Sequence, residues 1–149
     1  MRLTKLGAAL AIGALACGGG GEQQQQAQQT PATEQPMGAV VEVKMTGTGT
    51  TAAFEPTALT IAPGTTVRFV NVSGGPHNIA FWADSIPAGA AAVLNAAMTG
   101  RTMGDLSSLM VTQPNETYDI SFANAPAGAY KTYCLPHLAM GMKMTITVQ

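Results

Sequence analysis

The sequence predicts an all-β fold, a Greek-key β-sandwich of about seven to eight strands, for the chain from Met37 onward. Charged residues make up only 10% of the 149 residues, and glycine, proline and threonine are scattered throughout. Short stretches rich in β-branched and aromatic residues recur between turn residues, at the spacing of an antiparallel sandwich. The alanine-rich stretch Pro87–Met98 interrupts this pattern and is expected to hold a short helix or an irregular crossover. The length suits one domain with a single core.

The strand pattern is clearest at the C-terminal end. Between Met142 and Val148, apolar residues at every second position alternate with lysine and threonine, which is the period of a strand with one buried face. Tyr118–Phe122 alternates in the same way, and Ala62–Gly64 and Ala125–Gly128 supply turns. The expected strands are Val40–Met45, Ala58–Ile61, Thr66–Val72, His77–Phe81, Thr117–Phe122, Ala129–Tyr133 and Met142–Val148.

Residues 1–16 have the pattern of a signal peptide that directs export. Arg2 and Lys5 form a basic start, and an apolar run from Leu6 ends in the small-residue cleavage site Ala14–Ala16. The apolar run is too short to span a bilayer. The mature protein is therefore expected outside the cytoplasm.

Residues 17–36 are expected to tether the domain to a membrane. Ala14–Gly18 resembles the lipobox of bacterial lipoproteins, which implies a lipidated Cys17 on the periplasmic side of a bacterial membrane. Ordinary signal-peptide cleavage at the same bond is the alternative, but it would leave an exposed thiol in an oxidising compartment. The Gly-, Gln- and Pro-rich run from Gly18 to Pro36 lacks apolar periodicity, and as a random coil it would span roughly 25 Å.

The charge balance excludes a nucleic-acid partner. Seven basic and eight acidic residues give a formal net charge of -1. Removal of Arg2 and Lys5 with the signal leaves five basic residues against eight acidic ones, or -3. Such a chain offers no basic surface to a phosphate backbone.

The candidate functional residues are the few cysteine, histidine and methionine side chains that soft metals prefer. Beyond the tether there is one cysteine, Cys134, and the whole chain has two histidines, His77 and His137. Cys134 and His137 flank a two-residue gap after an expected strand, and Met140 and Met142 follow. Taken separately, each residue type is commonly a packing or surface residue. Together they account for every cysteine and histidine of the domain in one metal-ligand pattern.

This donor set favours a copper ion that changes oxidation state. A thiolate and two imidazoles in a trigonal plane with a weak axial thioether suit both Cu(I) and Cu(II). A rigid site then needs little rearrangement when an electron arrives or leaves. Placing the ligands on one short loop that Pro136 restricts gives part of this rigidity, and the turn Gly74–Pro76 does the same for His77.

From about Gly38 to Gln149 the chain resembles the plastocyanin branch of the cupredoxins. The segments that carry the resemblance are Pro76–Phe81, Tyr130–His137, Gly141–Met142 and Glu55–Gly64. The resemblance implies the cupredoxin fold and one copper ion in a type 1 (blue) site. The copper ligands that it implies are His77, Cys134, His137 and, in the axial position, Met142.

The resemblance also implies roles around the metal. Met140 is the rival axial ligand, because amicyanin-like relatives have a shorter loop between histidine and methionine. Asn78 would fix the ligand loop, and its backbone N–H would bond the sulfur of Cys134. Tyr133 would offer an electron entry route. The ring edge of His137 would exchange electrons through an apolar surface patch.

The expected function is that of a monomeric electron carrier rather than an enzyme. It would shuttle single electrons between redox proteins, such as cytochromes or membrane electron-transfer complexes. A periplasmic copper chaperone or storage protein is the alternative. A catalytic copper protein would need further histidines for a second copper site.

One segment departs from the resemblance. Photosynthetic plastocyanins carry clustered acids where this chain has Trp82–Ile86, in which only Asp84 is acidic. Trp82 therefore indicates either a different docking surface or additional core. Apolar residues at Leu135 and Leu138 predict a more hydrophobic patch around His137.

Overall fold

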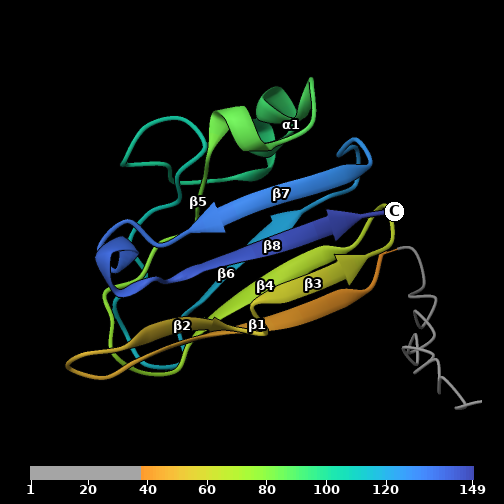
Figure 1. The fold of residues 1–149 in the computed structure, drawn as a ribbon. Coiled ribbons are helices and arrows are strands. Elements are labelled where there is room, and N and C mark those ends of the chain that lie inside the picture. The colour runs from red at the N-terminus through yellow and green to blue at the C-terminus, as the bar shows by residue number, and fades with distance from the viewer. Residues whose placement is uncertain (1–37) are drawn as a thin grey trace, which may run out of the picture. The chain divides into compact units, whose positions relative to one another are not determined.

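The computed structural model describes residues 38–149 (Figure 1). The predicted signal peptide, tether and lipidated Cys17 lie outside the described residues. Within the described part there are eight strands and one α-helix: β1 (Val40–Gly47), β2 (Ala52–Glu55), β3 (Ala58–Ile61), β4 (Thr66–Asn71), β5 (Ala80–Phe81), α1 (Ala90–Ala97), β6 (Thr117–Ser121), β7 (Gly128–Tyr133) and β8 (Lys143–Val148). Two short 3-10 turns, η1 (Ala83–Ser85) and η2 (Leu138–Met140), complete the elements. No helix of this part is long and apolar enough to cross a membrane.

The strands form two four-stranded sheets, which confirms the predicted all-β sandwich. The strand order is β2-β1-β4-β6 in the first sheet and β3-β8-β7-β5 in the second. The sheets are mixed rather than purely antiparallel, because β1 pairs with β4 and β3 pairs with β8 in parallel. Each parallel pair joins strands that are far apart in the sequence. The chain passes from the first sheet to the second between β2 and β3, and returns to the first between β3 and β4. A parallel pair needs such a crossover and cannot be closed by a tight turn.

Two strand predictions need correction. The strand β2 was not predicted, because Ala52 and Phe54, its two buried residues, give too short an alternation to stand out. The expected strand His77–Phe81 is regular only over Ala80–Phe81. His77 instead forms an isolated bridge with Val111. Pro76 just before it has no N–H, so a longer ladder cannot continue in that direction.

The core lies between the sheets, where alternate side chains of each strand meet. In β6 and β8 the buried positions alternate with exposed or half-buried ones, as the period of two requires. Aromatic rings make edge-to-face contacts in this core, with Phe122 and Phe81 both packed against Tyr130. Ala90 and Leu94 of α1 add to it. Each fully buried large apolar side chain contributes about 1.5–3 kcal/mol, so the core fixes the ends of the strands that carry the candidate ligands.

Candidate metal centre

The loop from Cys134 to Met142 joins β7 to β8 at one end of the sandwich (Figure 1). Three backbone hydrogen bonds close it: the His137 N–H donates to the Cys134 carbonyl at 3.2 Å, the Met142 N–H to the His137 carbonyl at 3.2 Å, and the Cys134 N–H to the Met142 carbonyl at 3.1 Å. The 3-10 turn η2 ends at Gly141, whose φ of +82° lies in the left-handed region that favours glycine. The fold of the loop thus sets the spacing of its sulfur and nitrogen atoms.

The segment between β4 and β5 brings His77 to the same place. Gly74 has a φ of +74°, and a Cβ atom there would lie 2.4 Å from the Cα of Gly47, so the turn requires glycine. After the turn, the His77 N–H donates to the Val111 carbonyl at 3.0 Å and the Val111 N–H donates back at 2.8 Å. This reciprocal pair fixes the backbone of His77.

Three potential ligand atoms converge between these two segments. The Sγ of Cys134 lies 3.7 Å from the Nδ1 of His77 and 3.5 Å from the Nδ1 of His137, and the two nitrogens are 3.1 Å apart. Cys134 and His77 are fully buried, whereas His137 is half-buried. A thiolate and two imidazole nitrogens that face one point are the donors that copper prefers.

The tautomer of His77 is set by a backbone carbonyl. Its Nε2 lies 2.9 Å from the Ser73 carbonyl oxygen, which can only accept, so Nε2 carries the hydrogen and Nδ1 offers its lone pair to the site. Burial lowers the pKa of His77, against the hydrogen bond to Ser73, and the nearby His137 lowers it further. The ring is therefore neutral near pH 7, which is the form that binds metals.

The Cys134 thiol is held in surroundings that disfavour its free anion. Burial raises the pKa of Cys134, while the backbone N–H groups of Asn78 and His137 act in the opposite direction. A bound cation deprotonates a coordinating thiol outright. The site thus suits a metal thiolate rather than a free, reactive cysteine.

The two candidate axial methionines have different surroundings. Met142 is fully buried, and its backbone is hydrogen-bonded to both Cys134 and His137. Met140 is 44% exposed on the outer side of η2. Met142 is thus held inside the protein at the end of the ligand loop, whereas Met140 lies on the surface.

Asn78 connects the two segments that carry the donors. Its backbone N–H lies 3.5 Å from the Sγ of Cys134, and its Oδ1 accepts a 2.7 Å hydrogen bond from the Leu135 N–H. Its Nδ2 donates to the Oγ of Ser107 at 3.0 Å, and the neighbouring Ser108 accepts from the Ile79 N–H at 2.9 Å. All of these groups except Leu135 are buried.

The supporting serines and carbonyls were not found by sequence reasoning. Ser107, Ser108, the Ser73 carbonyl and Val111 lie outside the predicted strands. Serines between apolar residues, as in Leu106–Leu109, are too common in a sequence to indicate a role. Their contact with Asn78 appears only when residues far apart in the chain are folded together.

The surface around the loop has an apolar and an aromatic part. Three apolar residues near half-buried His137 in the loop are exposed: Leu135 by 46%, Leu138 by 38% and Met140 by 44%. On the strand side of Cys134, the half-buried ring of Tyr133 stacks on Trp82, with ring centroids 4.4 Å apart and an interplanar angle of 29°. Trp82 is half-buried and is not part of the hydrophobic core.

Comparison with known proteins decides the family. Residues 41–149 match the family model described as copper binding proteins of the plastocyanin/azurin family. The chain belongs to this family. A plastocyanin from Scenedesmus fuscus is 39% identical over 109 residues, which are 73% of this chain and 99% of that protein. A plastocyanin from Rumex obtusifolius is 36% identical over 109 residues, which are 73% and 100% of the two chains.

Solved structures agree with the family and the fold. The oxidised plastocyanin from Dryopteris crassirhizoma matches with a TM-score of 0.57 and 27% identity, covering 73% of this chain and all of that one. The prediction of a plastocyanin-like cupredoxin is confirmed. As a family member the chain is a type 1 copper electron-transfer protein, and the chaperone alternative is not favoured.

Proposed function

We propose that the chain carries single electrons on one copper ion held by His77, Cys134, His137 and Met142. The observation that carries the assignment is the convergence of the potential ligand atoms of His77, Cys134 and His137 within 4.8 Å of one another. Burial and backbone bonding of Met142 support it over Met140 as the axial ligand. The copper ion supplies the exchange between Cu(II) and Cu(I).

The protein keeps the proposed ligand atoms at fixed positions. His77 is fixed by Val111 and Ser73, and the loop is closed on itself and joined to Asn78. Pro136 restricts φ within that loop. The N–H of Asn78 stabilises negative charge on the sulfur of Cys134, which tunes the reduction potential.

The partners contact the apolar end of the molecule. We infer that Leu135, Leu138 and Met140 surround the accessible edge of His137 and form a brief contact with a redox protein such as a cytochrome or a membrane electron-transfer complex. A small, weakly charged contact suits rapid exchange. No substrate is transformed, so the protein acts as a carrier and not as an enzyme.

Export and anchoring complete the proposal. The signal-peptide pattern of residues 1–16 and the lipobox-like Ala14–Gly18 support a periplasmic protein lipidated at Cys17. A lipid anchor with the tether of residues 17–36 would raise the local concentration of the domain near membrane partners. Mass spectrometry of the N-terminal peptide from cells that make the full chain tests this, with Cys17→Ser as the control. A diacylglycerol adduct that is lost in the variant is expected, and an unmodified Cys17 would refute anchoring.

Repeated redox cycling in the presence of a Cu(I) chelator tests the carrier role. The copper-loaded chain is expected to give a reversible one-electron wave in cyclic voltammetry and to keep its copper through many cycles. Two of the proposed ligands, Cys134 and His77, are fully buried, so we expect the chelator to remove the metal slowly. Transfer of copper to the chelator in the first cycles would instead indicate a chaperone.

A further inference from the structure

The loop that carries three of the proposed ligands also holds an exposed methionine. The chain has nine methionines, and seven remain in residues 38–149 once Met1 and Met37 are set aside. Of these seven, Met103 is 45% exposed on the segment after α1, and Met140 is 44% exposed at the end of η2. The other five are buried or half-buried. An oxidant must reach the sulfur to convert a methionine to its sulfoxide, so exposure selects Met103 and Met140.

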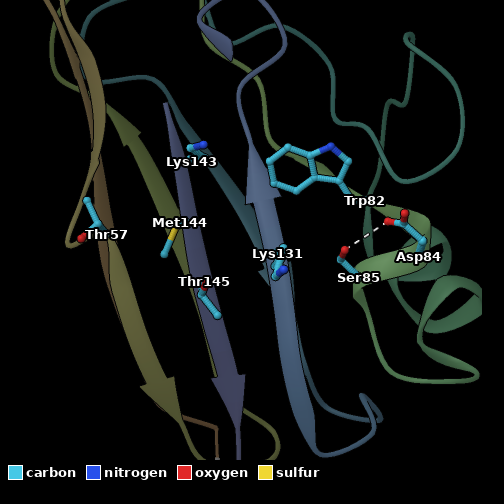
Figure 2. A pocket seen from close by; sticks show the side chains of 8 residues that line it. All are labelled: Thr57, Trp82, Asp84, Ser85, Lys131, Lys143, Met144 and Thr145. Atoms are coloured by element: carbon cyan, nitrogen blue, oxygen red, sulfur yellow. Dashed lines mark hydrogen bonds between the residues drawn. The ribbon is translucent and has the colours of Figure 1, made fainter. Parts of the chain in front are cut away.

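Met144 on β8 shows how well the remaining thioethers near the site are covered. It is one of the residues that line a hollow over β7 and β8, which η1 borders (Figure 2). Only 3% of Met144 is exposed even there, and Met142 is fully buried. Neither sulfur offers the open approach that Met140 has.

The backbone of η2 places Met140 on the same side of the turn as His137. The Met140 N–H donates to the His137 carbonyl at 3.0 Å, and the Gly141 N–H donates to the Leu138 carbonyl at 2.9 Å. A 3-10 turn has three residues per turn, so side chains three positions apart lie above one another. The thioether of Met140 therefore belongs to the surface through which His137 is proposed to exchange electrons.

A sulfoxide at this position would change the chemistry of that surface. The exposed side chains of Leu135 and Leu138 are apolar, as is the thioether of Met140, whereas a sulfoxide is polar and accepts strong hydrogen bonds. The nearby N–H groups of Leu138, Met140 and Gly141 already donate to carbonyls of the loop. A partner that covers the sulfoxide would therefore have to remove its water without replacing the hydrogen bond, which is unfavourable.

We propose that Met140 is a reversible oxidation site, at which hydrogen peroxide forms a sulfoxide that slows electron exchange through the apolar end of the protein. This rests on the proposed function, in which His137 exchanges electrons at that end and Met142 is the axial ligand. The modification regulates contact with the partner and leaves the proposed ligands unchanged.

The oxidation transfers one oxygen atom and two electrons. The sulfur of Met140 attacks one oxygen of hydrogen peroxide, the O–O bond breaks as the S–O bond forms, and the second oxygen leaves as water. The sulfur is oxidised and the peroxide is reduced. A methionine sulfoxide reductase reverses the change with a dithiol, which becomes a disulfide while the sulfoxide oxygen leaves as water.

Mapping of the oxidised residues tests whether Met140 is open to the oxidant. The full chain loaded with Cu(II) is treated with hydrogen peroxide, digested and analysed by mass spectrometry. We expect one added oxygen atom on Met140 and on Met103, and none on Met142 or Met144. Oxidation of Met103 without oxidation of Met140 would overturn the proposal. If Met140 then reacted only in the metal-free chain, copper would be protecting it, and Met140 would replace Met142 in the proposed ligand set.

Electron self-exchange between Cu(I) and Cu(II) copies of the full chain tests the effect on contact. Line broadening in NMR spectra gives the rate for the parent, Met140→Leu and Met103→Leu, and each protein is compared with its own unoxidised form. Oxidation should slow the parent and Met103→Leu by about fivefold or more, and Met140→Leu by less than about twofold. Methionine sulfoxide reductase with a dithiol should restore the parent. Equal slowing of the parent and Met140→Leu would overturn the proposal.

Two further variants separate this proposal from the proposed function. Met140→Gln, which introduces a polar side chain of similar length, should slow self-exchange without peroxide and retain the blue absorption band. Leu138→Asp should also slow it, because it places a charge in the apolar end. Slowing by Leu138→Asp together with full speed of the oxidised parent would refute only the role of Met140. Full speed of Leu138→Asp would refute the apolar end as the contact surface, and a parent chain without the blue band would refute the copper site itself.

Discussion

The two segments that meet at the metal centre are built differently. The upstream segment, which supplies His77, is clamped by Val111 and Ser73 and is buried from His77 to Phe81. The loop from Cys134 to Met142 closes mainly on itself, and between its buried ends it exposes most of its residues. The upstream segment acts as a fixed frame, and the loop places one proposed ligand, His137, toward the surface.

Because of this difference, we expect the two histidines to have different roles. His77 has no exposed surface, and its position is fixed by hydrogen bonds to two parts of the chain, Ser73 and Val111. His137 is half-buried and is surrounded by exposed apolar side chains. We therefore expect His77 to serve the stability of the site and His137 to serve electron exchange with partners.

The largest expected effect separates the two histidines. Both His77→Gly and His137→Gly should lose the blue absorption band of the Cu(II)-loaded chain. Added imidazole should restore the band in His137→Gly, because the half-buried position admits a small ligand, and should not restore it in His77→Gly. Absorption titrations with imidazole measure both variants. Equal rescue would show that the two positions do not differ in access.

The next effect separates the two methionines. Met142→Ala should lower the free energy of unfolding of the metal-free chain by about 2–5 kcal/mol, because it leaves a cavity in the core. Met140→Ala should change it by less than about 0.5 kcal/mol, because the side chain is exposed. Urea unfolding measures both. A reduction potential that shifts in Met140→Ala and not in Met142→Ala would make Met140 the axial ligand.

A smaller effect is expected at the serine that supports Asn78. Ser107→Ala leaves the buried Nδ2 of Asn78 without its acceptor and should cost about 1–3 kcal/mol of unfolding free energy. It should also shift the reduction potential, because Asn78 donates to the sulfur of Cys134. Ser121→Ala, at a half-buried position remote from the site, is the control. Identical potentials in the parent chain and Ser107→Ala would leave Ser107 with a structural role only.

The smallest effect concerns the stability in acid of the turn that Glu116 closes, just after Val111. The carboxylate of Glu116 accepts hydrogen bonds from the N–H groups of Gln113 and Thr112, and these bonds lower the pKa of Glu116 from its ordinary value of 4.5. Because the pKa is lower in the folded protein, the contribution to stability is present above the unfolded value and is lost as pH falls through the folded one. Glu116→Gln should therefore reduce the difference in unfolding free energy between pH 6 and lower pH, by a small amount for this exposed group. Urea unfolding as a function of pH measures it, and parallel curves for the two proteins would contradict the assignment.

Much of the fold followed from the period of two in the sequence. The alternation in Met142–Val148 and Tyr118–Phe122 marks strands because each has one buried face. The short β2 and the parallel pairs were missed, because four residues give little periodicity and because pairing direction depends on long-range connections.

For the candidate site, the sequence predicted the types of ligand residue but not the groups that hold them in place. Cysteine, histidine and methionine are scarce enough in this chain for Cys134, His137 and His77 to indicate a metal without structural information. Their supports, such as Ser107 and the Ser73 carbonyl, are ordinary groups that become specific only through contact in the folded chain. The stacking of Trp82 on Tyr133 is likewise a product of packing between η1 and β7.

The decisive measurement for the proposed copper–thiolate bond is the absorption spectrum of the Cu(II)-loaded chain, recorded beside that of its Cys134→Ser variant. We expect an intense blue or green band from sulfur-to-copper charge transfer that is present in the parent chain and absent from the variant. A serine keeps the size of the side chain but removes the thiolate. A band that survives in Cys134→Ser, or a parent chain that binds copper without colour, would contradict the proposed type 1 site at His77, Cys134, His137 and Met142.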